Sequence, residues 1–248
     1  MADSSSLTLY QYGGIARGTT LSPPCGKAHM ALAFKGLAYD VKTLRTPMEV
    51  RRVNPRGTVP VLQLGDERVP DSTDILTALD ERYPDPPLEP EGAEDRARAK
   101  LIEDWADEVL YGYGLWTRFF EPGNFERLKP YIVRGLPGFM RPFAPAYVRR
   151  MIRKRVRGRG VVQKGTAAVR RERSECFQAL AVLLRAGPWL AGERISRADL
   201  TVAAFCDQFM LAEITPDLAA ELAALPEVVE WLERVHERAP NAARPGTS

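Results

Sequence analysis

Two side chains that could form or stabilise a thiolate lie three residues apart in the stretch LSPPCGKAHM, residues 21–30. They are the hydroxyl of Ser22 and the thiol of Cys25. Ser22 is a good N-cap and proline is favoured at the first helical position, so the stretch predicts a helix that begins at Pro23. As a cap, the Ser22 oxygen could accept only from the Cys25 amide, because Pro24 has no N–H. The hydroxyl hydrogen then stays available to a thiolate held at the helix N-terminus.

This helix is predicted to lie between two strands. Alternating strand formers at 7–12 precede it, Gly36 is a natural stop after Lys35, and strand formers return at 39–44. Strand, helix and strand in this order are typical of a βαβ unit in an α/β domain.

A third strand is predicted at 58–64, although Pro60 lies inside it. Proline cannot donate to a strand ladder, so either this is an edge position or a cis Val59–Pro60 bond leaves the Val59 backbone free. Gly65-Asp66 predicts a hairpin turn into a short further strand. Asp71-Ser72 predicts the start of another helix, which prolines end near residue 84.

Length and composition indicate an ordinary globular protein, long enough for two modest domains. Of 248 residues, 45% are hydrophobic and 27% are charged, and the sequence shows no signal-peptide pattern and no apolar run typical of a membrane span. Three widely spaced cysteines do not suggest a disulfide framework, so we expect a cytoplasmic location. The two histidines, His29 and His236, show no metal-ligand spacing, so we expect no metal. The sequence also lacks the G-x-S-x-G elbow of a serine hydrolase.

Taken in their order and spacing, these motifs resemble those of the cytosolic glutathione transferase superfamily. The resemblance rests on Ser22-Pro23-Pro24-Cys25-Gly26-Lys27, on Asn54-Pro55 followed by Val59-Pro60-Val61-Leu62, and on Asp71-Ser72. It implies a thioredoxin-like glutathione-binding domain at 1–86, a linker at 87–94 and an all-helical domain at 95–248. It also implies glutathione as the cosubstrate and a homodimer as the assembly.

The resemblance implies roles for four residues in binding glutathione. In the family, a backbone next to a cis proline pairs with the cysteinyl part of glutathione, which assigns that role to Val59 and Pro60. An acid–serine pair grips the γ-glutamyl group, which assigns that role to Asp71 and Ser72. A helix N-terminus with a free hydroxyl is a good carboxylate site. Family members more often have Glu or Gln at the position of Asp71.

Three residues are candidates for activating the glutathione thiol. Ser22 stands where glutaredoxins and omega-like members have a cysteine and zeta-like members have a serine. Cys25 then falls at the second cysteine of a C-x-x-C motif whose first cysteine is missing, which disfavours dithiol exchange. We expect Ser22 to be the hydrogen-bond donor, with Tyr12, at the end of the first predicted strand, as a backup. Packing is the more common role for Cys25 and for Tyr12.

From Glu94 onward the hydrophobic pattern is helical. By resemblance, one helix lines the pocket for an apolar second substrate, although an aromatic stripe is more often core. The aromatic candidates for this pocket are Tyr111, Tyr113, Trp116 and Phe120. Gly112 and Gly114 in the same helix predict a kink or a close approach. Further on, Ser196 and Asp199 form a capping box, an arrangement that the family has at the start of a buried helix.

A strongly basic segment separates these regions. Residues 141–173 carry 12 Lys or Arg and one acid, Glu172, in a chain of net charge +3. Residues 147–157 could attract anionic substrates or a membrane surface. They contain little Leu, Phe or Trp for insertion, so we favour a solvated face over membrane contact. Stacking aromatics are not interleaved with the charges, so we expect no nucleic-acid binding.

Three functional hypotheses follow. The first is a detoxification-type glutathione transferase that activates glutathione as a thiolate for addition to an apolar electrophile, or for an isomerisation or cleavage step. The alternative is a protein of the same fold that binds glutathione, another ligand or a protein partner without turnover. A weaker similarity to the metaxin and failed-axon-connection branch favours this alternative. The third is a monothiol disulfide oxidoreductase acting through Cys25. These motifs do not identify the electrophile.

Overall fold

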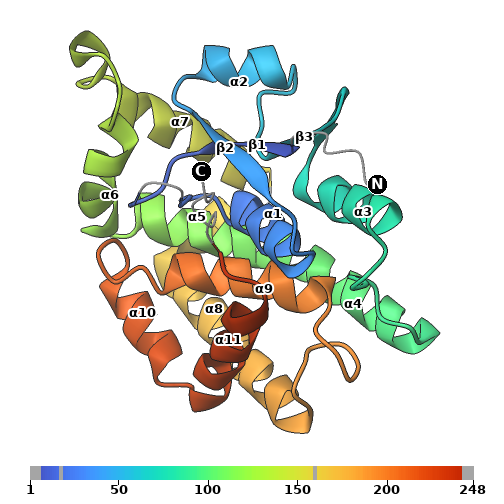
Figure 1. The fold of residues 1–248 in the computed structure, drawn as a ribbon. Coiled ribbons are helices and arrows are strands. Elements are labelled where there is room, and N and C mark those ends of the chain that lie inside the picture. The colour runs from blue at the N-terminus through green and yellow to red at the C-terminus, as the bar shows by residue number, and fades with distance from the viewer. Residues whose placement is uncertain (1–6, 17–18, 159–160, 242–248) are drawn as a thin grey trace.

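A four-stranded mixed sheet forms the centre of the N-terminal half (Figure 1). This computed structural model describes residues 7–16, 19–158 and 161–241. Strand β1 (Leu7–Tyr12) pairs in parallel with β2 (Tyr39–Leu44) and antiparallel with β3 (Val61–Leu64). β3 continues antiparallel into β4 (Glu67–Pro70), which gives the order β2-β1-β3-β4. The predicted α/β thioredoxin-like half is confirmed.

Helices make up the rest of the molecule. In the N-terminal half they are α1 (Pro23–Phe34), α2 (Pro47–Val53) and α3 (Ser72–Arg82). The following helices are α4 (Ala93–Trp105), α5 (Tyr111–Phe120), α6 (Asn124–Val133), α7 (Ala144–Arg157), α8 (Val161–Ala186), α9 (Arg197–Phe209), α10 (Pro216–Ala223) and α11 (Pro226–Arg238). None of the helices in the described ranges is long and apolar enough to cross a bilayer.

The sequence predicted most of the elements around the site. β1, β2 and α1 occupy the expected ranges, and Gly36, with a φ of +66°, follows α1 as the stop. The Val59–Pro60 bond is cis, one of the two predicted alternatives, and the third strand begins only at Val61. The short helix α2 was not predicted; Thr46 caps it by accepting from the Glu49 amide at 3.2 Å.

The long helix that carries the aromatic stripe is interrupted before its glycines rather than at them. A π-helical turn, Ala106–Leu110, joins α4 to α5. Gly114 instead permits a close approach, because a Cβ there would lie 2.6 Å from the ring of Phe209 on α9. Of the two predicted alternatives, a kink or a close approach, Gly114 therefore provides the close approach of α5 and α9.

The predicted capping box starts α9 and is confirmed. The Ser196 side chain accepts from the Asp199 backbone amide, and the Asp199 side chain accepts from the Ser196 backbone amide. Asp199 is fully buried and also accepts from the Leu190 amide at 2.9 Å and from Trp231 Nε1 at 3.0 Å. This buried carboxylate therefore ties the start of α9 to the loop before it and to α11.

A buried polar chain under the sheet involves His29. His29 Nδ1 lies 2.6 Å from the Tyr39 hydroxyl and Nε2 lies 2.6 Å from Gln11 Oε1. Because an amide oxygen only accepts, Nε2 carries the proton and Nδ1 accepts from Tyr39. Burial lowers the pKa of His29 to about 4.

This burial predicts an acid-sensitive fold. The unfolded imidazole takes up a proton near pH 6.5 and the folded one only near pH 4. The free energy of unfolding should therefore fall by about 3 kcal/mol as the pH drops through this window. Urea unfolding of wild type and His29→Gln between pH 6.5 and pH 4 measures this loss. The free energy of unfolding of the variant should depend less on pH than that of the wild type.

His236 provides the matched control for this measurement. Its Nε2 lies 2.8 Å from Asp207, whose hydrogen bond raises the pKa of His236. Its stabilising effect is present at low pH and is lost as the pH rises through the folded pKa. His236→Gln should therefore leave the acid-side loss intact. An equal flattening in both histidine variants would contradict the assignment to His29.

Candidate active site

Ser22 is held at the end of a loop that runs from β1 to α1. Its amide donates to the Thr20 hydroxyl at 3.1 Å, and that hydroxyl donates to the Tyr12 carbonyl at 2.9 Å. Ser22 is half-buried and occupies the N-cap position of α1, but its side chain makes no cap hydrogen bond. The expected bond from the Cys25 amide is therefore absent, and the hydroxyl is free of a capping role.

Two buried side chains from the helical half anchor the same loop. Arg118 on α5 donates to the Leu21 carbonyl at 2.7 Å, and Gln208 on α9 donates to the Thr20 carbonyl at 2.9 Å. Burial lowers the pKa of Arg118 to about 10, so the guanidinium still carries its charge at neutral pH. Sequence reasoning missed both residues. The available signal was a single arginine within the apolar run LWTRFF.

Cys25 lies under Ser22, in the interior. Its side chain is fully buried, and burial raises the pKa of its thiol to about 11. Hydrogen bonds from Ser22, the Tyr12 backbone and Thr20 work in the opposite direction without overcoming burial. The thiol is thus protonated at neutral pH, which disfavours the oxidoreductase hypothesis.

Tyr12, at the end of β1, lies close to side chains of α5 and α7. Burial raises the pKa of Tyr12, while the positive charge of Arg155 on α7 lowers it. Tyr111 on α5 and Tyr147 on α7 are also close enough to affect this pKa, and Arg155 donates to the Tyr111 hydroxyl at 2.8 Å. The surroundings of Tyr12 therefore combine two further tyrosines with one guanidinium. Arg155 and Tyr147 were missed because their distance from Tyr12 in the sequence hides the contact.

The four residues predicted to bind glutathione lie in one corner of the sheet. The Asp71 amide donates to the Pro60 carbonyl at 3.3 Å, next to Val59. Asp71 has a φ of +84°, a region costly for a residue with a Cβ, and its side chain caps α3 by accepting from the Thr73 amide at 2.9 Å. Ser72 follows as the first residue of α3 and is buried.

A buried ion network joins the start of α3 to α1. Lys27 is fully buried; its ammonium lies 2.5 Å from Glu103 and 2.8 Å from Asp107, and it donates to the Thr73 hydroxyl at 2.9 Å. Burial raises the pKa of Asp107, although Lys27 opposes this. The Asp107 side chain is about a quarter exposed, so one carboxylate of the network reaches the surface beside Thr73. Sequence reasoning did not identify Lys27, Glu103 or Asp107.

Comparison with known proteins identifies this architecture. Residues 18–87 match the family described as glutathione S-transferase, N-terminal domain, and residues 139–239 match the glutathione S-transferase C-terminal domain. The chain belongs to the glutathione transferase superfamily. A crystal structure of a glutathione S-transferase from Rhodospirillum rubrum F11 is 26% identical, with a TM-score of 0.63 over 96% of this chain and 90% of that one.

Two curated relatives match over shorter stretches. Glutathione S-transferase Z1 from Arabidopsis thaliana is 40% identical over 77 residues, which cover 29% of this chain and 35% of that protein. A stringent starvation protein A homolog from Pasteurella multocida is 33% identical over 89 residues, covering 33% of this chain and 42% of that protein. The matched stretches thus span less than half the length of these two relatives.

Within this glutathione transferase fold, the four aromatic residues predicted to line a pocket lie in two different environments. Tyr113 and Trp116 are buried, and the Tyr113 hydroxyl donates to Glu172 at 2.7 Å. Phe120 packs against Trp116 with ring centroids 5.2 Å apart. These three residues pack among the helices, and their role in lining a substrate pocket stays a prediction. Tyr111 alone of the four lies close enough to Tyr12 to affect its pKa.

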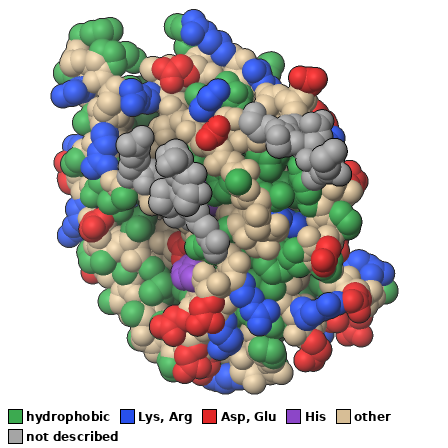
Figure 2. All heavy atoms as spheres, in the orientation of Figure 1, with side chains coloured by type: hydrophobic (Ala, Val, Ile, Leu, Met, Phe, Trp, Pro, Cys, Tyr) green, Lys and Arg blue, Asp and Glu red, His purple; other side chains and the backbone are tan. Residues whose placement is uncertain are grey.

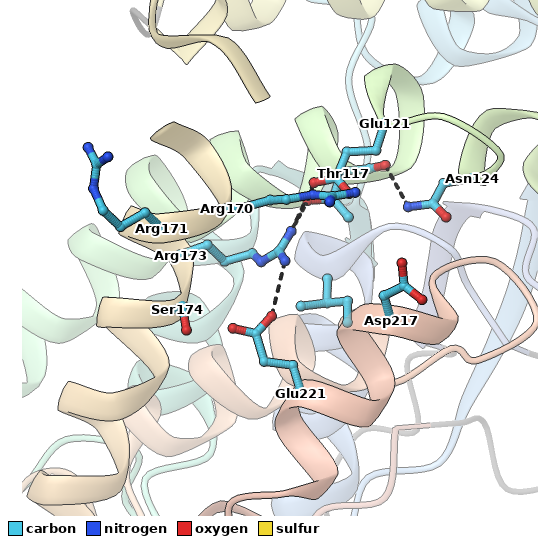
Figure 3. Close-up of a pocket in the computed structure, with 10 residues that line it drawn as sticks. Thr117, Glu121, Asn124, Arg170, Arg171, Arg173, Ser174, Asp217 and Glu221 are labelled. Atoms are coloured by element: carbon cyan, nitrogen blue, oxygen red, sulfur yellow. Dashed lines mark hydrogen bonds and ion pairs between the residues drawn. The ribbon is translucent and has the colours of Figure 1, made fainter. Parts of the chain in front are cut away.

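Two cavities lie away from the predicted binding corner. One, of about 390 Å³, is lined by α5, α8 and α10 and contains ion pairs from Arg170 and Arg173 to Glu121 and from Arg173 to Glu221 (Figure 3). These charges satisfy one another. The other, of about 480 Å³, lies between Thr20 and the end of α9. Across the described ranges, no three His, Cys, Asp or Glu side chains are grouped to hold a metal ion.

The protonated state of Cys25 predicts slow modification. With a pKa of about 11, its thiolate fraction at pH 8 is about one in a thousand. Iodoacetamide should label it at least about a hundredfold more slowly than a free cysteine of ordinary pKa. Peptide mass spectrometry of the folded protein measures this, with protein unfolded in urea as the control. Rapid labelling of folded Cys25 near neutral pH would contradict the assignment.

Proposed function

We propose that this glutathione transferase fold binds glutathione between the starts of α1 and α3 and activates its thiol with the Ser22 hydroxyl. One observation carries the proposal: the Lys27–Thr73 hydrogen bond holds the first turn of α3 against α1, next to the turn that Ser22 begins. Glutathione bound across both helix starts would contact the Ser22 hydroxyl with its thiol and Asp71 and Ser72 with its γ-glutamyl group.

The start of α3 supplies the chemistry for a γ-glutamyl group. The Ser72 hydroxyl and the positive dipole end of this helix favour a carboxylate. Asp71 is exposed, and Asp107 is partly exposed beside Thr73, so either carboxylate could pair with the ammonium of the same group. The backbone of Val59, adjacent in space to Asp71 through Pro60, would pair with the cysteinyl part.

The start of α1 supplies the chemistry for a thiolate. A glutathione thiol of ordinary pKa is only a few per cent ionised at pH 7. Lowering its pKa by about 2 units takes about 2.7 kcal/mol, which one charge-assisted hydrogen bond and the helix dipole can provide. Ser22 is suited to donate because its backbone is fixed by Thr20 and its side chain makes no cap bond. Tyr12 remains the backup, since its raised pKa keeps a proton to donate.

The acceptor would bind beside Tyr12, where Tyr111, Tyr147 and Arg155 lie close to it. The aromatic rings suit an apolar electrophile, for addition or for an isomerisation or cleavage step. A homodimer and a cytoplasmic location remain predictions from the resemblance and from the cysteine pattern.

A second candidate function is ligand binding without turnover. It is favoured by Pro23 and Pro24, which remove two amides that usually attract an anion to a helix start. It is also favoured by the relative named as a stringent starvation protein A homolog, a name that states no transferase activity. Calorimetric titration with glutathione in buffers of different ionisation enthalpy separates the two. Proton release near neutral pH supports activation, and binding without release supports the second candidate.

Removing the Ser22 hydroxyl should impair activation and spare binding. In Ser22→Ala, kcat should fall roughly tenfold to a hundredfold while the Kd for glutathione changes little, since one hydrogen bond to the charged form is lost. The pKa of bound glutathione, followed by thiolate absorbance, should rise. Ser174→Ala, a serine of the distant cavity, is the control. Unchanged kcat in Ser22→Ala would transfer the role to Tyr12, to be tested with Tyr12→Phe.

Neutralising Asp71 should weaken binding without unfolding α3. Asparagine retains the capping oxygen and tolerates a positive φ, so Asp71→Asn changes mainly the charge. We expect the Kd for glutathione to rise about tenfold, with the melting temperature nearly unchanged. Asp107→Asn tests the other carboxylate in the same titration. If neither variant weakens binding, the γ-glutamyl group is not held at the start of α3.

A further inference from the structure

The connection from α6 to α7 protrudes from the molecule and carries exposed aromatic side chains. It lies at the upper left of Figure 1, and Figure 2 shows hydrophobic and basic side chains together at that corner. Phe139 is 78% exposed, Phe143 74% and Tyr147 54%. Among the described residues, none of the three belongs to a hydrophobic cluster. The apolar residues that the basic segment lacked at 147–157 are thus supplied just before it.

Cations share the outward face of α7 with these aromatics. Phe143, Tyr147, Arg150, Lys154 and Arg157 follow the three- and four-residue steps of one helical face. We call these five residues, together with Phe139, the α7 face. On the opposite side, Ile152 and Val156 are buried against α5 and α6.

The cations of the α7 face have no partners among the residues that the structure describes. Within the described ranges, no carboxylate lies within ion-pair distance of Arg150, Lys154 or Arg157, and none of the three stacks on a ring or donates a hydrogen bond. Arg149 and Arg153, in contrast, lie over the ring of Phe120 and help to attach α7. The free charges are therefore those that point away from the core.

We propose that the α7 face docks on an anionic phospholipid bilayer, with Phe139 and Phe143 entering the headgroup region and Arg150, Lys154 and Arg157 meeting lipid phosphates and carboxylates. Exposed aromatics flanked by cations are the composition that binds such an interface. A second copy of this chain fits poorly, because two strongly basic segments would repel each other. A single-stranded nucleic acid needs a groove to follow its backbone, whereas these aromatics protrude at a convex tip.

The test is co-sedimentation of the full chain with vesicles of phosphatidylcholine alone or of phosphatidylcholine mixed with phosphatidylserine. We expect binding to the mixed vesicles only, weakened by salt. Phe139→Ser combined with Phe143→Ser should weaken it at least about tenfold. Arg150→Glu combined with Lys154→Glu should weaken it by more than about tenfold, since each basic group contributes about fivefold near an anionic surface.

Matched controls distinguish vesicle binding by the α7 face from nonspecific hydrophobic adsorption and from an effect of net charge. Val182→Ser with Leu183→Ser removes two exposed apolar side chains on α8, and Arg82→Glu with Lys100→Glu makes the same charge change elsewhere. Both should bind as wild type does. Equal binding to neutral vesicles, no binding at all, or equal losses in the controls would each overturn the proposal. So would serine variants that shift the oligomeric state, or lose RNA binding, while vesicle binding is unaffected.

Discussion

A single buried ammonium group, that of Lys27, determines how the two halves of the molecule meet. It is fully buried, so it requires carboxylates within reach, and Glu103 near the end of α4 and Asp107 in the π-helical turn provide them. Arg197 at the start of α9 donates to Glu103 at 2.5 Å and completes the network. Removing one member of such a network costs about 3–5 kcal/mol because it leaves an unpaired buried charge. The alignment of α1 with α3 therefore depends on the helical half.

The loop before α1 depends on the helical half in the same way. Arg118 and Gln208 bind its carbonyl groups, and Thr20 binds the amide of Ser22. These contacts leave the Ser22 hydroxyl without a capping bond, and its hydrogen bond is to the buried Cys25 thiol beneath it. A hydroxyl whose backbone is already fixed loses little entropy when it donates to a ligand. The packing that keeps the Cys25 thiol neutral thus also fixes Ser22 where it would donate to the thiol of bound glutathione.

Helix α7 brings three environments together. Its inner side packs through Ile152 and Val156, and its outer side carries the cations of the α7 face, which are unpaired among the described residues. Tyr147, a member of that face, and Arg155 lie close enough to Tyr12 to affect its pKa. If the α7 face rests on a bilayer, Tyr12 would lie near the lipid surface. Apolar electrophiles that partition into membranes would then reach it over a short path.

Elements with local signals could be predicted from the sequence: β1, α1 with its stop at Gly36, and the Ser196–Asp199 capping box. Periodicity, capping and turn chemistry act over a few residues, so spacing reveals them. Only the tertiary structure decided that Cys25 is buried, that Lys27 needs two carboxylates from α4 and its π-helical turn, and that Tyr111 parts from its aromatic neighbours. Burial and charge pairing depend on which distant segments pack together, and residue spacing along the chain does not reveal those contacts.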